Sequence, residues 1–98
     1  MEITEKRFVQ VNAEVHINWF GPVFPVYRLY VNDELFAERE WRYPGHYLDE
    51  LIQIEAIPGK YNIRYEVLNE RHVHLEIKSM QVIQGPGKIK GNSLLKII

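Results

Sequence analysis

The eleven residues Val9-Gln10-Val11-Asn12-Ala13-Glu14-Val15-His16-Ile17-Asn18-Trp19 alternate strictly between apolar and polar side chains. Successive side chains of a β-strand point to opposite faces, whereas residues on one face of a helix lie three or four positions apart. The six apolar residues can therefore share one face only if the stretch is extended. This stretch predicts a long strand with one face turned toward a core.

The same two-residue period returns in the second half of the chain. Tyr61 to Val67 and Val73 to Ile77 repeat the alternation, and Asn32-Asp33-Glu34 separates two further β-rich stretches as a tight turn would. The segment Tyr47–Ala56 suits either a helix or a strand, and we favour the strand because a lone short helix fits poorly on a sandwich. The predicted strands are Phe8–Trp19, Pro25–Asn32, Leu35–Arg42, Tyr47–Ala56, Lys60–Leu68, His72–Ile83 and Leu94–Ile98.

Length and composition favour one all-β domain over residues 1–98, an antiparallel β-sandwich of about seven strands. The chain has no cysteine, which excludes disulfides, thiolate metal sites and cysteine nucleophiles. Twelve basic and thirteen acidic side chains are spread without a block of one sign, so we expect no nucleic-acid partner. No apolar run is long enough for a membrane helix or a signal core, so we expect a soluble protein without a membrane partner.

The residues that could perform catalysis are few. Thr4, Ser79 and Ser93 are not set in a nucleophile motif, and Asp33-Glu34 and Asp49-Glu50 are expected to be solvated charges. His72 and His74 share a strand face and could ligate a metal only if His16, His46 or a carboxylate supplied a third ligand. The segment from Gly85 to Asn92 is expected to be an irregular loop. The sequence thus predicts neither an enzyme, a cofactor nor a metal site.

The segment Ile57-Pro58-Gly59-Lys60-Tyr61, followed by Ile63, Tyr65 and Val67, resembles the turn-and-strand of immunoglobulin-like, fibronectin-type-III-like and transthyretin-like sandwiches. Proline and glycine form the turn, and the tyrosine hydroxyl can bond to backbone at the edge of the core. The resemblance implies a fold, because these families have unrelated functions. The stretch from Tyr27 to Arg42, continued through the Pro-Gly turn, is similar to small β-sandwich structural proteins of tailed-phage virions, either capsid decoration or tail-associated proteins. This second resemblance implies a location in the virion after synthesis in the host cytoplasm.

If successive strands run antiparallel, the connections of the sandwich sort into two chemically different ends. One end collects aromatic residues; the other collects glycine, proline, Lys60, Lys88 and Lys90. Rigid aromatic side chains with polar tips are typical of interface hot spots and of sugar-stacking platforms. Trp19 and Trp41 could instead cap the core. The predicted partner-binding residues are Trp19, Phe20, Phe24, Trp41, Tyr43, His46 and Tyr47.

The segment Leu94-Leu95-Lys96-Ile97-Ile98 is apolar enough that it must be docked. It can close the edge of its own sandwich, which we favour, or add a strand to a neighbouring subunit. In the second case Leu94, Leu95, Ile97 and Ile98 would form an assembly strand.

These features favour a non-catalytic structural or assembly module that binds protein, through self-association or within a larger assembly. Two alternatives remain open. One is a carbohydrate-binding module in which Trp41, Tyr43 and Tyr47 stack on sugar rings, and the other is a small inhibitor or adaptor protein.

Overall fold

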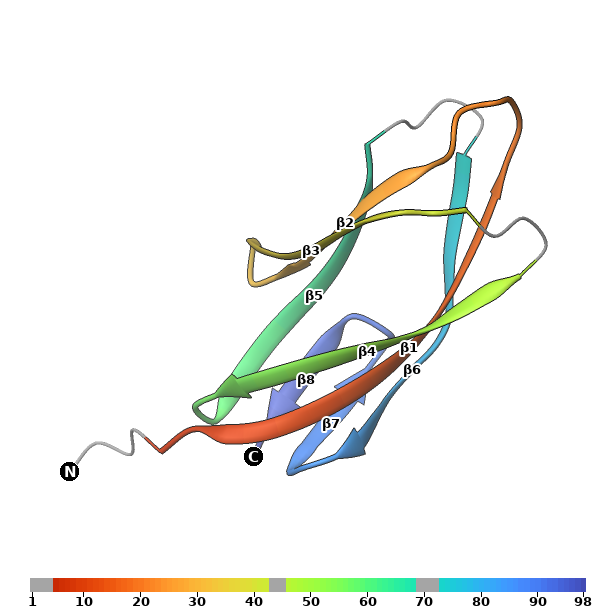
Figure 1. The fold of residues 1–98 in the computed structure, drawn as a ribbon. Helices are drawn as coiled ribbons and strands as arrows, with labels where there is room; N and C mark the ends of the chain where they lie inside the picture. Colours follow the sequence, from red (N-terminus) through yellow and green to blue (C-terminus); the bar gives the residue numbers. More distant parts are fainter. Residues whose placement is uncertain (1–4, 43–45, 69–72) are drawn as a thin grey trace.

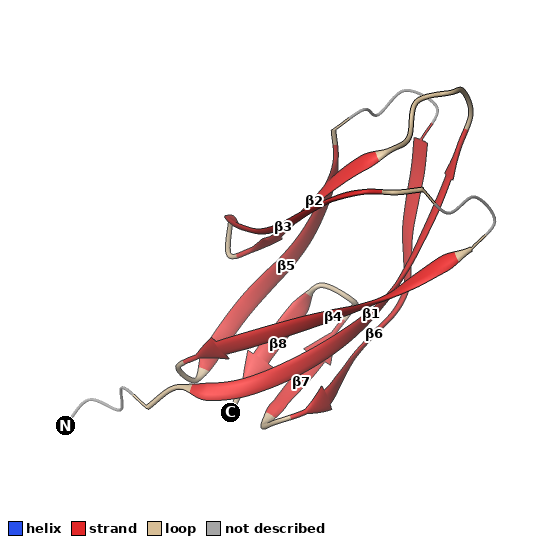
Figure 2. Cartoon of the chain, viewed as in Figure 1, coloured by secondary structure: helices blue, strands red, loops and turns tan. Residues whose placement is uncertain are grey.

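The computed structural model describes residues 5–42, 46–68 and 73–98. Within these ranges the chain forms strands and turns and no helix (Figures 1 and 2). There are eight strands: β1 Arg7–Trp19, β2 Val26–Val31, β3 Glu34–Glu40, β4 Tyr47–Ala56, β5 Gly59–Val67, β6 Val73–Gln84, β7 Gly87–Lys90 and β8 Leu94–Ile97. The segment Tyr47–Ala56 is thus a strand, as the sequence favours.

The strands form two antiparallel sheets in the order β4-β1-β6 and β3-β2-β5-β8-β7. The two sheets face each other as a sandwich, with β1 lying along the middle of the smaller one (Figure 1). The all-β sandwich predicted from the alternating stretches is therefore confirmed.

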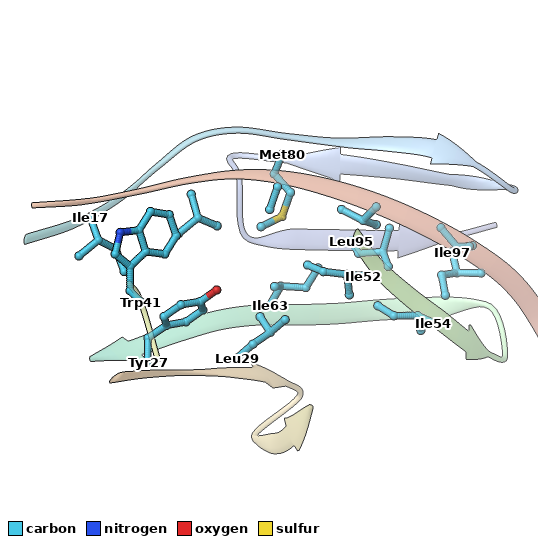
Figure 3. Packing of buried hydrophobic residues seen from close by; sticks show 14 residues of the cluster. Ile17, Tyr27, Leu29, Trp41, Ile52, Ile54, Ile63, Met80, Leu95 and Ile97 are labelled. Atoms are coloured by element: carbon cyan, nitrogen blue, oxygen red, sulfur yellow. The ribbon is translucent and has the colours of Figure 1, made fainter. Parts of the chain in front are cut away.

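The hydrophobic core consists of the side chains packed between the two sheets, and the apolar face of β1 is part of it. Val9, Val11, Ala13, Val15 and Ile17 are all buried. From the other sheet Leu29, Ile63, Leu95 and Ile97 meet them, as Figure 3 shows for the labelled side chains. Each buried aliphatic side chain contributes roughly 1.5–3 kcal/mol through the hydrophobic effect. Alternation in β1 and β5 thus decides which face of each strand lies inside.

One turn connects two strands of the larger sheet, and a second joins the smaller sheet to the larger one. Asn32 and Asp33 form a two-residue hairpin loop with φ of 50° and 66°, the left-handed pair that matches the twist of β2 and β3. The side-chain Oδ1 of Asn32 accepts the backbone N–H of Asn62 at 2.7 Å, which ties this hairpin to β5. At the Pro-Gly turn, the Tyr61 hydroxyl donates to the carbonyl of Ile57 at 2.6 Å. That bond to backbone is the one predicted for the tyrosine that follows the Pro-Gly turn.

The segment from Gly85 to Asn92 is not the irregular loop that the sequence predicts. Gly85 and Pro86 carry the chain from the smaller sheet to the larger one, and Gly87–Lys90 then forms β7 at the sheet edge. Gly85 has φ of +95°, and a Cβ there would lie 2.3 Å from the carbonyl oxygen of Phe8. Only glycine fits this corner, and the described chain therefore has eight strands rather than seven.

The C-terminal strand β8 lies inside its own domain. It pairs with β5 on one side and with β7 on the other, and Leu95 and Ile97 are buried in the core. Leu94 is half-buried and Ile98 is exposed. Docking on the chain's own sandwich is thus the arrangement observed. No helix of sufficient length and apolarity to cross a membrane occurs in the described ranges.

Candidate functional site

The ends of β1, β3 and β5 and the starts of β2, β4 and β6 gather at one end of the sandwich (Figure 1). This is the end at which strand parity places the aromatic residues. Tyr43 lies outside the described residues. The other six predicted residues are described, and they separate into three groups with different surroundings.

The first group is the loop from Phe20 to Pro25, which we call the aromatic loop. At its base Trp19 packs edge-to-face on Phe24, with ring centroids 6.2 Å apart. The Arg42 guanidinium lies over the Phe24 ring, 5.4 Å from its centroid. The backbone N–H of Trp41 donates to the carbonyl of Pro25 at 2.8 Å. These contacts fix the base of the loop on the ends of β1 and β3.

Above this base the aromatic loop presents apolar side chains to solvent. Phe20 is 85% exposed and Val23 is 67% exposed, while Phe24 is partly covered by its contacts. Leu68, at the same end, is also exposed. Large apolar side chains gathered on a fixed loop are typical of protein-binding surfaces.

Trp41 forms the second group alone, because its side chain is buried. Its ring packs against Tyr27 at a centroid distance of 6.4 Å, in the interior beside Ile17 (Figure 3). Trp41 therefore caps the core, the alternative that the sequence left open, and it offers no face to a ligand.

The third group, His46 and Tyr47, belongs to the start of β4. Tyr47 is exposed on the outer face of the smaller sheet, where its ring stacks on His16 at 5.3 Å. His16 in turn makes a 2.9 Å contact with the carboxylate of Glu14. His46 is exposed and has no described contact in this cluster. One face of the Tyr47 ring is thus already covered.

Glu50 is the residue whose environment the sequence interpretation misjudged. It was expected to be a solvated charge, but it is only 2% exposed. In β4, position 50 lies between Leu48 and Ile52 on the face that turns toward the core. The alternation that defines this strand therefore carries the signal, since it places Glu50 inside as soon as the segment is assigned to a strand.

The buried Glu50 carboxylate contacts three neighbouring strands of the opposite sheet. Its Oε1 accepts a hydrogen bond from the Tyr65 hydroxyl of β5 at 2.7 Å, and its Oε2 lies 3.4 Å from the Tyr27 hydroxyl of β2. Oε2 also accepts a hydrogen bond from Arg39 Nε of β3. A buried carboxylate is stable only when it is paired and hydrogen-bonded in this way. Glu50 thus fastens the two sheets to each other.

The same cluster changes the acidity of its tyrosines. Burial, and after it the charge of Glu50, raises the pKa of both Tyr27 and Tyr65 well above the ordinary value. A tyrosine with a raised pKa in the folded state contributes stability that is complete below the pKa of the unfolded chain, about 10, and is lost as the pH rises further.

Alkaline conditions are therefore expected to unfold the domain as these two hydroxyls lose their protons. Above about pH 10 the free energy of unfolding should fall by up to about 2.7 kcal/mol per pH unit, since two groups contribute about 1.36 each. Chemical denaturation at a series of alkaline pH values measures this slope. Replacing Tyr65 by Phe removes one of the two hydroxyls and should about halve the slope, and a stability that stays flat through this range would contradict the role given to Tyr27 and Tyr65.

The remaining sequence candidates do not converge on a centre. His74 is exposed on β6, and His72 and Thr4 lie outside the described residues. Ser79 lies on β6, and Ser93 follows the β7–β8 turn, where its carbonyl accepts the Ile63 N–H at 2.7 Å. In ranges 5–42, 46–68 and 73–98 no group of three histidine or carboxylate side chains could hold a metal ion.

Comparisons with known proteins give no relative for this chain. No protein-family model, no curated protein and no solved structure matches it. The described surfaces are therefore the basis of the function proposed below.

Proposed function

We propose that the protein is a non-catalytic assembly module that binds another protein through its aromatic loop. The observation that carries this proposal is the exposure of Phe20 and Val23 on a loop whose base is fixed by the Trp19, Phe24 and Arg42 contacts. A loop ordered before binding loses little conformational entropy when it docks. Burying each of these side chains contributes roughly 1.5–3 kcal/mol, enough for the pair to act as an anchor.

The interior of the sandwich supports a structural role over a catalytic one. Both oxygens of the Glu50 carboxylate are already engaged by Tyr27, Arg39 and Tyr65. A general acid or base must instead reach the proton of a bound substrate. The same bonds hold the two sheets in place behind the aromatic loop, as expected of a rigid scaffold that carries its binding residues on loops.

A protein partner is favoured over a carbohydrate. Stacking on sugar rings requires accessible flat aromatic faces, and burial of Trp41 removes one of the three residues for which that role was expected. Tyr47 has one face against His16, so a single open face is left to it. The exposed aliphatic side chain of Val23 has no flat aromatic face for a sugar ring and suits a protein surface better. An inhibitor or adaptor would use the same loop for the same class of partner.

The proposed setting is a larger particle, in line with the resemblance to virion structural proteins. In the immunoglobulin-like and transthyretin-like sandwiches that the Pro-Gly turn resembles, loops at one end of the sheets are free to carry recognition. The aromatic loop joins β1, which pairs with β4, to β2, which pairs with β5. It therefore lies at such an end of the two sheets.

The double variant Phe20→Ser, Val23→Ser is expected to lose its partner while it remains folded. The matched control is Leu35→Ser, Ile83→Ser, because these residues are also apolar and exposed, at 58% and 56%, but lie on β3 and β6. Affinity capture of native assemblies with wild type and both variants, quantified by mass spectrometry, compares them. We expect at least about a tenfold loss for the loop variant alone, the equivalent of about 1.4 kcal/mol. Equal capture by the two double variants would refute the assignment of the aromatic loop.

A further inference from the structure

Three lysines stand side by side on the outer face of the larger sheet, far from the aromatic loop. In the register of the sheet Lys60 of β5 is opposite Lys96 of β8, and Lys96 is opposite Lys88 of β7. Lys90 follows Lys88 by two positions and so points to the same face. All four side chains are exposed. We call Lys60, Lys88, Lys90 and Lys96 the lysine row.

The lysine row has no counter-charge in the part of the chain that is described. The ion pairs found there use arginine or histidine as the cation, and none uses a lysine. Like charges directly opposite each other on neighbouring strands destabilise a sheet. Lysines on an edge strand such as β7 can prevent unwanted strand pairing. Edge protection does not explain Lys96, because β8 is paired on both sides, by β5 and by β7.

The outer face of the smaller sheet has the opposite feature, two like negative charges in register. On the smaller sheet Glu14 of β1 is directly opposite Asp49 of β4, so two carboxylates are in register there. Asp49 accepts only a 3.4 Å contact from Asn12 Nδ2, and Glu14 contacts His16. Glu55 and Glu76 are exposed on the strands to either side, together with Lys78 of β6. In the described ranges no arginine or lysine pairs with Glu14 or Asp49.

We propose that the lysine row of one molecule binds the Glu14–Asp49 face of a second copy of this chain. Both charged rows run across neighbouring strands, so both repeat at the strand separation of about 4.8 Å. On two neighbouring strands an ammonium of one copy can therefore meet a carboxylate of the other. The contact relieves the like-charge repulsion of both faces together.

The two faces lie on different sheets, so the contact joins unlike surfaces of the two copies. Such a heterologous contact leaves one free face of each kind on every pair, and growth continues until a ring closes or a filament forms. The interaction involves exposed charges, so salt must weaken it strongly. This self-association does not use the aromatic loop, which stays available for the partner proposed above.

Reciprocal charge reversal tests the contact directly. In the variant Lys88→Glu, Lys96→Glu two carboxylates replace two cations of the lysine row, and in the variant Glu14→Lys, Asp49→Lys two ammonium groups replace the paired carboxylates, so each alone should sediment as a monomer. Mixed in equal amounts at low ionic strength, they should associate, and added salt should reverse this. Wild type should associate on its own. The control Glu34→Lys, Glu40→Lys changes the same number of charges on β3 and should associate as wild type does.

Sedimentation velocity from micromolar to millimolar protein measures the oligomeric state of each variant and of the mixture. Thermal melts verify that each variant is folded. Association of the mixture but of neither variant alone supports the proposal. A mixture of folded variants that remains monomeric overturns it. Wild type that remains monomeric at low salt also overturns it. This holds too if heparin, used as a polyanion probe, binds the lysine row of that monomer. The variant Phe20→Ser, Val23→Ser should associate normally, so failure of the aromatic loop would not be mistaken for failure of this contact.

Discussion

Truncation of the chain after Ser93 is expected to unfold the domain rather than to release an assembly arm. The deletion removes β8, which lies between β5 and β7 in the larger sheet. It takes the fully buried Leu95 and Ile97 out of the core and leaves β7 without a strand to pair with. The cost exceeds the usual net stability of a small domain, about 5–15 kcal/mol, because strand pairing is lost together with two core side chains.

Circular dichroism and size-exclusion chromatography of the truncated protein check this expectation. A milder companion is Leu95→Ala, which should cost about 2–5 kcal/mol, whereas Lys96→Ala on the outer face of the same strand should change stability by no more than about 0.5 kcal/mol. A truncated chain that stayed a native-like monomer and lost only assembly would show that the strand is exchanged between subunits.

Replacement of Glu50 by alanine is expected to be the most damaging single change to a charged residue. It leaves the Tyr27 and Tyr65 hydroxyls without their acceptor in the interior and removes the partner of Arg39. Removing one member of a buried, hydrogen-bonded charge pair costs about 3–5 kcal/mol. Urea denaturation of Glu50→Ala measures the loss, with Asp49→Ala as the control on the outer face of the same strand.

The comparison within β4 makes this test specific. Asp49 is exposed, and its only described contact is the long one from Asn12, so Asp49→Ala should stay within about 0.5 kcal/mol of wild type. Tyr65→Phe removes a single hydrogen bond and should cost about 1 kcal/mol. If Glu50→Ala were as stable as Asp49→Ala, Glu50 would not be holding the sheets together.

The strands with a clear two-residue period could be predicted from the sequence because the period itself requires a buried face. Val9 to Trp19 and Tyr61 to Val67 are of this kind. The segment Gly87–Lys90 could not, since it offers one apolar residue between two lysines and follows a Gly-Pro pair. It becomes a strand by pairing with β8, and its own four residues carry no signal of that pairing.

The sequence predicts which connections lie together at one end of the sandwich better than it predicts which of their side chains are exposed. Strand parity assigns the connections to one end, but it does not say which way each ring points. The Trp41 backbone bonds to Pro25, and its ring then turns inward onto Tyr27. Glu50 was missed because its acidic character outweighed its position between Leu48 and Ile52. The alternation of side chains along the strand predicts the burial of Glu50 better than its residue type does.

The central claim is that the aromatic loop is the protein-binding surface, and site-specific photocrosslinking tests it most directly. A benzophenone side chain placed at Phe20 should form a covalent product with another protein in the native assembly. The same side chain at Leu35, an exposed apolar residue on β3, should not. Crosslinks at position 20 alone are the predicted result. Crosslinks at position 35 with none at position 20 would contradict the claim.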